Sequence, residues 1–297
     1  MMLSSPPSSR PLRGTRIVSL ALNLPGPAAL MRLRALGARC LKVEPPGPAP
    51  DISGDPMGRY KPGAYAELHA GVRTVALDLK TERGQARLAR ELAQTDVLLT
   101  SFRPSALAKL GLGWPALHRA HPRLSLVEIV GAPGARAEEP GHDLTYLAEA
   151  GLITGTELPP TLPADMTGAL MAVEAVFAAL LLARGGRGVR RQVALSSAAE
   201  WLALPRAWGL TLPGGAVGGA HAGYRVYPCK DGRVAVAALE PHFTAALFQA
   251  AALPPPDARA PFAPAAHEAI AAWALGKSRR QLDALGRARD IPLYTLR

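Results

Sequence analysis

Cysteine is scarce in this chain: its 297 residues contain only Cys40 and Cys229. Two cysteines cannot supply a disulfide framework or a four-cysteine zinc site, and we assign no metal ligands. Free cysteines usually act as small buried hydrophobes, and reduced cysteines are typical of cytoplasmic proteins. The sequence therefore predicts two buried thiols and a cytoplasmic location.

The glycine patterns of nucleotide-binding loops are also missing. The loop after the first predicted strand reads Asn23-Leu24-Pro25-Gly26-Pro27. A dinucleotide-binding loop needs three spaced glycines for its tight turn and its close approach to pyrophosphate. A Walker loop, a His-Glu-x-x-His pair and a Gly-x-Ser-x-Gly elbow are absent as well. These absences argue against an NAD enzyme, a P-loop ATPase, a zincin protease and an α/β-hydrolase.

Two segments raise the question of a signal peptide or a membrane anchor. Met1–Gly14 is rich in serine and proline and lacks an apolar centre, so we expect a mobile tail. Met166–Ala183 is long and apolar, but Glu174 stands at its middle, where lipid would make a charge costly. We expect this run to form a buried helix and predict no membrane partner.

The net charge is +11, and arginine is spread along the chain. A basic surface can favour nucleic acids or phosphorylated ligands. The densest cluster is Arg184–Arg191, which contains three glycines and could pass for an RNA-binding segment. A basic turn that closes a helix is the better interpretation, because cations suit a helix C-terminus. We predict no nucleic-acid partner.

Short apolar runs alternate with helical patterns through the first two hundred residues. Such an order predicts a mostly parallel sheet with helices on both faces, because parallel strands need crossover connections. Thr81 is the expected N-cap of one helix, and Ser196 or Ser197 that of another. The expected strands are 15–21, 39–43, 74–79, 96–100, 124–130 and 192–195, with helices over 25–36, 81–92, 144–152 and the long apolar run.

A different pattern begins near Tyr224. Two alternating segments flank Asp231-Gly232, which predicts a β-hairpin, and two or three alanine-rich helices follow. The glycine-rich stretch before them shows no periodicity and is typical of a linker. We therefore expect a tail over 1–14, a large α/β domain over 15–211, a linker over 212–223 and a small α+β domain over 224–297.

Three ionisable residues are candidates for chemistry. His142 precedes a helical pattern, where the helix dipole would favour a neutral imidazole that can accept a proton. Asp165 stands just before the long apolar helix, where it could be a plain N-cap or a nucleophile or base. Glu240 ends a strand and precedes a helix, and is otherwise an ordinary turn residue. The spacing alone does not choose between these roles.

An ordered series of segments resembles the family III CoA-transferases of the CaiB/BaiF type, which include α-methylacyl-CoA racemases. Each piece is weak alone, but together they run in order from residue 14 to residue 245. The segments are Gly14–Glu44, Arg73–Lys80, Ser101-Phe102-Arg103-Pro104, Leu110–Gly113, Pro140–Ala148, Ala164-Asp165 and Ala238–Phe243.

This resemblance implies a Rossmann-like large domain, acyl-CoA as substrate and an interlocked homodimer. Asp165 falls on the family's catalytic aspartate, His142 on the racemase histidine, and Glu240 on a glutamate that racemases place near that histidine. The positions that match the family's CoA site are Leu77, Asp78, Leu79, Lys80, Ser101, Phe102, Lys109, Gly141 and Asp143.

Three hypotheses follow from the resemblance. The first is racemisation at the α-carbon of a CoA thioester by two bases, His142 and Asp165. The second is CoA transfer between carboxylic acids through an acyl intermediate on Asp165. The third is a CoA-binding protein with impaired catalysis, because Pro45 replaces a basic residue that often helps to hold CoA, and because the chain stops at Arg297, where family members usually continue.

Overall fold

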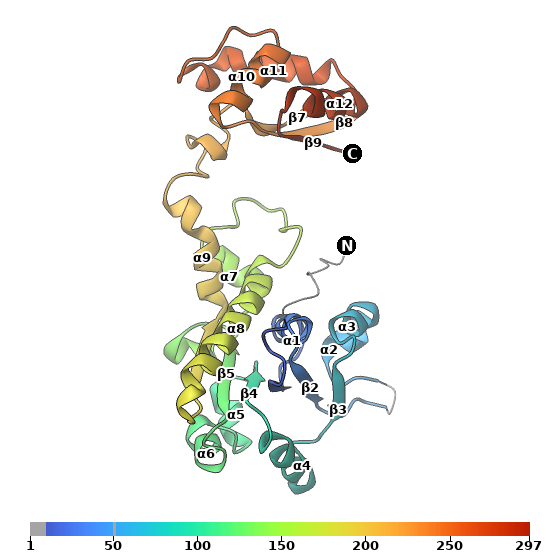
Figure 1. Ribbon diagram of the computed structural model, residues 1–297, viewed down its shortest axis with the longest axis vertical. Coiled ribbons are helices and arrows are strands. Elements are labelled where there is room, and N and C mark those ends of the chain that lie inside the picture. The colour runs from blue at the N-terminus through green and yellow to red at the C-terminus, as the bar shows by residue number, and fades with distance from the viewer. Residues whose placement is uncertain (1–9, 50–51) are drawn as a thin grey trace. The chain divides into compact units, whose positions relative to one another are not determined.

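Six parallel strands form the sheet of the first of two compact units (Figure 1). The computed structural model describes residues 10–49 and 52–297, and the units divide between Ala203 and Leu204. The strands of this sheet are β1 Arg16–Ser19, β2 Arg39–Glu44, β3 Arg73–Ala76, β4 Val97–Thr100, β5 Ser125–Val130 and β6 Arg190–Ala194. Their order is β3-β2-β1-β4-β5-β6, so the predicted parallel α/β architecture is confirmed.

Helices cover both faces of this sheet, as the alternation of strand and helix predicts. They are α1 Pro25–Ala35, α2 Pro56–Tyr60, α3 Pro62–Leu68, α4 Glu82–Leu92, α5 Pro104–Lys109, α6 Trp114–Ala120, α7 Asp143–Glu149, α8 Pro163–Leu182 and α9 Leu195–Ala207, which continues into the second unit.

Neighbouring residues of each strand point to opposite faces and build two separate hydrophobic cores. On one face Ile17, Leu99 and Val127 pack with α1 and α8. On the other face Val18, Leu98 and Leu126 pack with leucines of α4, α5 and α6. Because both of its faces are covered at the centre, the sheet has mostly apolar inner strands, β1 and β4, without a polar alternation, which is typical of parallel sheets.

The chain before the first strand is ordered where the structure describes it. Residues 1–9 of the predicted mobile tail lie outside the described residues. Leu12 is only 2% exposed, and its N–H donates to the carbonyl of Leu36 at 3.1 Å. The tail prediction is therefore wrong for residues 10–14, because one leucine in this polar stretch reaches the core beside α1.

Two helix starts differ from the sequence prediction. Thr81 caps α4 as expected, with its hydroxyl accepting the N–H of Gly84 at 3.1 Å. Asp165, however, is the third residue of α8, whose N-cap position is Leu162. Ser196 and Ser197 lie inside α9 and cap nothing, because β6 passes directly into that helix at Leu195.

The long helix α8 is buried along one face only. Pro163–Gly185 satisfies the length and composition of a membrane span, as core helices of soluble proteins also do. Ala169, Ala172 and Val176 are buried in the core with α1 and the sheet, whereas Leu170 and Glu174 are exposed. The prediction of a buried helix is thus right for one face of α8 and wrong for the other.

The second unit, from Leu204 to Arg297, has its own sheet and its own core. Strands β7 Tyr224–Cys229 and β8 Gly232–Ala237 form the predicted hairpin, and Gly232 has a φ of +153°. β9 Leu293–Leu296, which the sequence reading missed, pairs with β8. Helices α10 Pro241–Ala250, α11 Pro264–Leu275 and α12 Arg279–Arg289 complete this α+β unit.

Candidate active site

A cleft of about 550 Å³ opens at the carboxyl edge of the six-stranded sheet. Its walls include the segments that follow β1 and β4, which are Leu22–Pro25 and Ser101–Arg103, and the end of β5 with the next residue, Ile129–Gly131. β1 lies between β2 and β4, so the chain order along the sheet reverses at this point. Open parallel sheets bind their ligands at such a switch point.

Two polar side chains hold the loop between β1 and α1 at the cleft. The backbone N–H of Asn23, which has a φ of +63°, donates to both carboxylate oxygens of Asp55 at 3.1 and 3.2 Å. The N–H of Leu22 donates to the hydroxyl of Ser101 at 3.2 Å. This loop therefore takes its shape from residues far along the chain rather than from the glycines of a nucleotide-binding loop.

Asp55 belongs to a buried charge cluster behind that loop. Its carboxylate forms an ion pair with Lys42, and both side chains are fully buried. Glu44 lies 3.9 Å from the same ammonium and accepts from Ser53 and Tyr65 at 2.8 Å each. Burial lowers the pKa of Lys42, and Asp55 acts in the opposite direction. The cluster anchors the cleft wall, and none of its charges is left without an opposite partner.

His142 occupies the N-cap position of α7, with an exposed side chain at the cleft. Its backbone N–H donates to the hydroxyl of Thr145 at 3.0 Å, and that hydroxyl donates to the His142 carbonyl at 2.7 Å. These two bonds fix the backbone while the imidazole stays available to a ligand. The helix start predicted at this histidine is confirmed.

Asp143 ties the start of α7 to the start of α8. Its side chain is 4% exposed, and its carboxylate accepts the backbone N–H of Asp165 at 2.9 Å. One carboxylate is thereby placed beside another at the cleft wall. Like charges in such proximity favour protonation of one of the two.

This environment raises the pKa of Asp165 to about 6. Burial is the largest cause, the neighbouring charge of Asp143 adds to it, and His142 acts in the opposite direction. A carboxyl group with a pKa of about 6 exchanges protons readily near neutral pH, which is the property of an acid-base catalyst.

Tyr146 lies between two glycines under the cleft. A Cβ atom at Gly131 would be 2.4 Å from its hydroxyl oxygen, and one at Gly141 would be 2.5 Å from it. Burial is the largest cause that raises the pKa of Tyr146, and the charge of Asp165 adds to it. Gly141 is therefore required beside His142 to make room for the tyrosine.

The sequence of this chain matches the family model of the family III CoA-transferases over residues 12–297. The chain belongs to this family. Some of its relatives are named as CoA-transferases and others as α-methylacyl-CoA racemases. A probable fatty acyl-CoA transferase, Rv3272 of Mycobacterium tuberculosis, is 35% identical over 58% of this chain and 47% of that protein. Human α-methylacyl-CoA racemase is 32% identical over 78% of this chain and 62% of that protein. The chain thus spans less than two thirds of the length of these relatives.

Solved structures of the family share the fold. The crystal structure of Rv3272 superposes with a TM-score of 0.82 at 25% identity, covering 97% of this chain and 86% of that chain. A CAIB/BAIF family protein from Brucella suis gives a TM-score of 0.72 at the same identity.

The cleft brings together six of the predicted site residues and leaves six elsewhere. Gly141, His142, Asp143 and Asp165 line it together with Ser101 and Phe102. Leu77 and Asp78 line a separate hollow of about 450 Å³, whereas Leu79 lines another hollow beside α4 and α6. Lys80 and Lys109 are exposed on the first unit. Glu240 belongs to the second unit, where it is the exposed N-cap residue of α10.

Several cleft residues escaped the sequence reading. Tyr60 and Arg103 line the cleft, and burial, with the charges of Asp55 and Asp165, raises the pKa of Tyr60. Tyr146 was included in a predicted helix and in the family-like segment Pro140–Ala148, but no role at a site was predicted for it. Gly54-Asp55 lies in a polar loop, outside every predicted strand and helix. A loop has no hydrophobic periodicity, so the sequence pattern did not mark Asp55 as a structural residue. Among the described residues, no group of three His, Cys, Asp or Glu side chains could hold a metal ion.

Proposed function

We propose that the cleft binds an acyl-CoA thioester and moves the proton of its α-carbon between the two faces of that carbon. The observation that carries the proposal is the meeting of His142 and Asp165 at one cleft, with the pKa of Asp165 raised to about 6. An imidazole and a carboxyl group at one cleft can each act as acid or base.

The proposed reaction runs in two proton transfers. The neutral imidazole of His142 removes the α-proton, and the electron pair of the broken C–H bond moves into the thioester to form an enolate. Protonated Asp165 then delivers its proton to the other face of the carbon, and the C–H electrons return. The reverse direction uses the opposite protonation states. His142 leaves the cycle protonated and Asp165 ionised, so exchange with water restores the starting state and brings solvent protons into the substrate.

The enolate oxygen needs a hydrogen-bond donor. The N–H of Asp165 already donates to Asp143, so it is not free for that purpose. Arg103 lines the same cleft from the N-cap position of α5 and is the candidate donor. A guanidinium in a partly desolvated cleft stabilises developing negative charge more than water does.

CoA transfer is the second candidate, and the names of several relatives favour it. In that reaction the carboxylate of Asp165 attacks the thioester carbonyl, CoA leaves as a thiolate, and an acyl anhydride forms on the aspartate. Attack of CoA on the aspartyl carbonyl then releases the acid and leaves an aspartyl thioester. This route uses Asp165 as nucleophile and gives His142 no necessary role.

For the CoA part of the substrate, we propose Ser101, Phe102, Gly141 and Asp143 as contacts within the cleft. Leu77, Asp78, Leu79, Lys80 and Lys109 are proposed contacts of its nucleotide end. Three arginines, Arg83, Arg87 and Arg90, line the same hollow as Leu77 and Asp78, which supports a site for phosphate groups. We also propose an interlocked homodimer, a role for Glu240 near His142, and a cytoplasmic location, from the family resemblance and the cysteine content.

The deciding experiment is incubation of the protein with (2R)- or (2S)-methylacyl-CoA in heavy water. Mass spectrometry reports deuterium at the α-carbon, and chiral chromatography reports inversion. We expect deuterium incorporation and inversion with the wild-type protein. In His142→Ala and Asp165→Asn the rate of both should fall by about 10²–10⁴-fold, which is the usual contribution of one acid-base group. Glu174→Gln removes an exposed carboxylate on the same helix as Asp165 and should keep full activity.

The same samples test the transferase route. If His142→Ala retains full activity in CoA exchange with a carboxylic acid, and a CoA adduct is found on Asp165, the proton-transfer proposal is wrong. If every substrate tried gives neither exchange nor adduct, although CoA binds, the protein is an impaired CoA-binding member of the family.

A further inference from the structure

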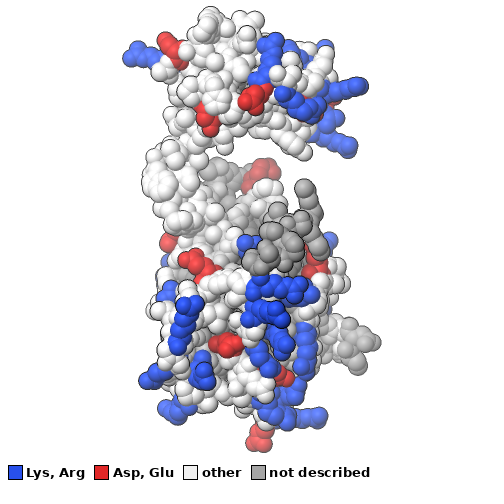
Figure 2. Space-filling model, in the orientation of Figure 1, with Lys and Arg blue, Asp and Glu red and all other residues white. Residues whose placement is uncertain are grey.

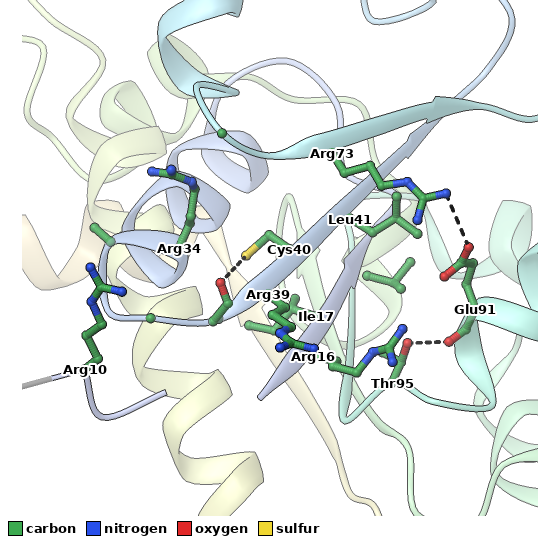
Figure 3. A pocket seen from close by; sticks show the side chains of 15 residues that line it. Arg10, Arg16, Ile17, Arg34, Arg39, Cys40, Leu41, Arg73, Glu91 and Thr95 are labelled. Atoms are coloured by element: carbon green, nitrogen blue, oxygen red, sulfur yellow. Dashed lines mark hydrogen bonds and ion pairs between the residues drawn. The ribbon is translucent and has the colours of Figure 1, made fainter. Parts of the chain in front are cut away.

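A second cavity, of about 580 Å³, opens at the amino edge of the same sheet (Figure 3). Strands β1, β2 and β3 begin there at Arg16, Arg39 and Arg73. Arg10 and Arg34 reach the cavity from the chain before β1 and from the last turn of α1. The candidate active-site cleft lies at the carboxyl ends of the strands, so this cavity lies at the opposite edge of the sheet and is a separate site.

The cavity carries a strong positive charge. Five arginines and one glutamate, Glu91, line it, which gives a formal charge of +4. Glu91 lies 3.9 Å from the guanidinium of Arg73 and 2.7 Å from Arg87 on its own helix, so its charge is shared. Figure 2 shows basic side chains gathered over the part of the first unit where Figure 1 draws α1.

Most of these guanidinium groups are not engaged by carboxylates. Arg16 donates to the side-chain carbonyl of Gln94 at 2.7 Å, which leaves its charge uncompensated. Within residues 10–49 and 52–297, no carboxylate lies within 4.0 Å of the guanidinium of Arg10, Arg34 or Arg39. Uncompensated like charges in one hollow repel one another, and a bound anion removes that repulsion.

The backbone makes room for two of the arginines. Gly71 has a φ of +69°, and a Cβ atom there would be 2.1 Å from a guanidinium nitrogen of Arg34. Gly37 has a φ of +104°, and its Cβ would be 2.8 Å from the Cβ of Arg10. A side chain at either glycine would be strained by the positive φ and would force the neighbouring arginine to shift.

The remaining wall is neutral. Ile17, Leu41 and Ala38 supply apolar surface. Burial raises the pKa of Cys40 to about 12, and its thiol lies 3.8 Å from the Ala38 carbonyl. The thiol therefore stays protonated and adds neither charge nor a nucleophile. The site thus has the properties of a binding pocket for an anion and has no group for covalent chemistry.

We propose that this cavity binds a small anion that carries at least two phosphate groups. Guanidinium groups form paired hydrogen bonds with phosphate oxygens, and five of them line this cavity from different elements. The volume lies in the range of small-molecule sites, and a concave hollow suits a compact ligand better than a nucleic-acid strand. The diphosphate can come from a free polyphosphate or nucleotide, or from a second CoA molecule.

Isothermal titration calorimetry of the full chain with inorganic pyrophosphate tests the proposal. We expect the wild-type protein to bind pyrophosphate. Its affinity should fall steeply between 50 and 200 mM salt, because salt screens the attraction between the arginines and the anion. Arg34→Gln and Arg39→Gln should each weaken binding by about tenfold, as expected for loss of one charge-assisted contact. Both side chains are exposed, so the fold should persist, and an unchanged Tm checks this. Arg119→Gln, an exposed arginine of α6 outside the cavity, should bind like the wild type.

The outcomes separate the sources of the ligand. If ADP and pyrophosphate lose affinity in the variants while CoA does not, a free polyphosphate or nucleotide is supported. If CoA loses affinity by the same factor, a second CoA is supported. The proposal fails if 1 mM pyrophosphate gives no binding to the wild-type protein, or if orthophosphate binds as tightly as pyrophosphate. It also fails if the variants bind pyrophosphate unchanged, or if only a single-stranded oligonucleotide binds.

Discussion

Replacing Asp165 by asparagine should stabilise the first unit at neutral and alkaline pH while it removes activity. The carboxyl group is partly buried and lies beside the charge of Asp143, and both effects raise its pKa to about 6 from an ordinary value of 3.8. The folded protein therefore holds this proton more tightly than the unfolded chain does. Ionisation of Asp165 above pH 6 costs stability, and an amide at this position avoids that cost.

The size of the effect follows from the shift. A change of one pKa unit corresponds to about 1.4 kcal/mol, so the full shift is worth about 3 kcal/mol. The side chain keeps some contact with solvent, which screens the charge, and we expect about 1–2 kcal/mol. The penalty is absent below about pH 4, grows as the pH rises to 6 and is complete above it. For a unit of this size the Tm of the variant should rise by about 2–8 °C at pH 8.

Differential scanning calorimetry at pH 4 and at pH 8 measures the difference in Tm between the variant and the wild type. The other titrating groups are common to both proteins, so their contributions cancel in this difference. The expected difference is large at pH 8 and close to zero at pH 4. Glu174→Gln on the exposed face of α8 should show no such dependence on pH. Equal Tm differences at the two pH values, or destabilisation at pH 8, would refute the assignment of Asp165 as a carboxyl group with a raised pKa.

Four further predictions concern other parts of the molecule. Lys42→Met should destabilise the first unit by about 3–5 kcal/mol in urea unfolding, because it leaves a buried carboxylate without its cation. Gly141→Ala should cost about 1–3 kcal/mol and most of the proton exchange, because its Cβ would collide with Tyr146, whereas Gly155→Ala, with open space around it, should be neutral in both assays. Lys109→Ala should weaken CoA binding and reduce its salt dependence in calorimetric titrations; equal affinity and salt response would remove this lysine from the site. Light scattering should report a homodimer at micromolar concentration, and a monomer would contradict the inference from the family.

The centre of the sheet could be predicted from the sequence because its inner strands, β1 and β4, are short and mostly apolar runs. Both faces of the sheet are covered, so no polar alternation interrupts runs such as Val97–Thr100. Thr81 was found because an N-cap is a local signal. β9 was missed because Leu293–Leu296 is exposed in part and gains its stability from pairing with β8, which no local pattern reveals.

The two proposed acid-base residues could be named from the sequence as candidates, but their surroundings could not. His142 and Asp165 stand at helix starts, which a sequence displays. The bond from Asp165 to Asp143 spans 22 residues, and the support of Asn23 by Asp55 spans 32. Such contacts depend on the packing of several elements together, so the raised pKa of Asp165 is a property of the folded unit alone.

The order of the strands has a consequence for synthesis of the chain. At the centre of the sheet, Ile17 of β1 pairs with Val97 of β4, so 80 residues separate the two partners. A ribosome adds about 5–20 residues per second, so β1 waits about 4–16 s for its second neighbour. During that time the N–H and C=O groups along one edge of β1 have no strand to pair with, and pairing over such distances is slow in itself. We expect the newly made amino-terminal segment to be a substrate for chaperones until β4 has emerged.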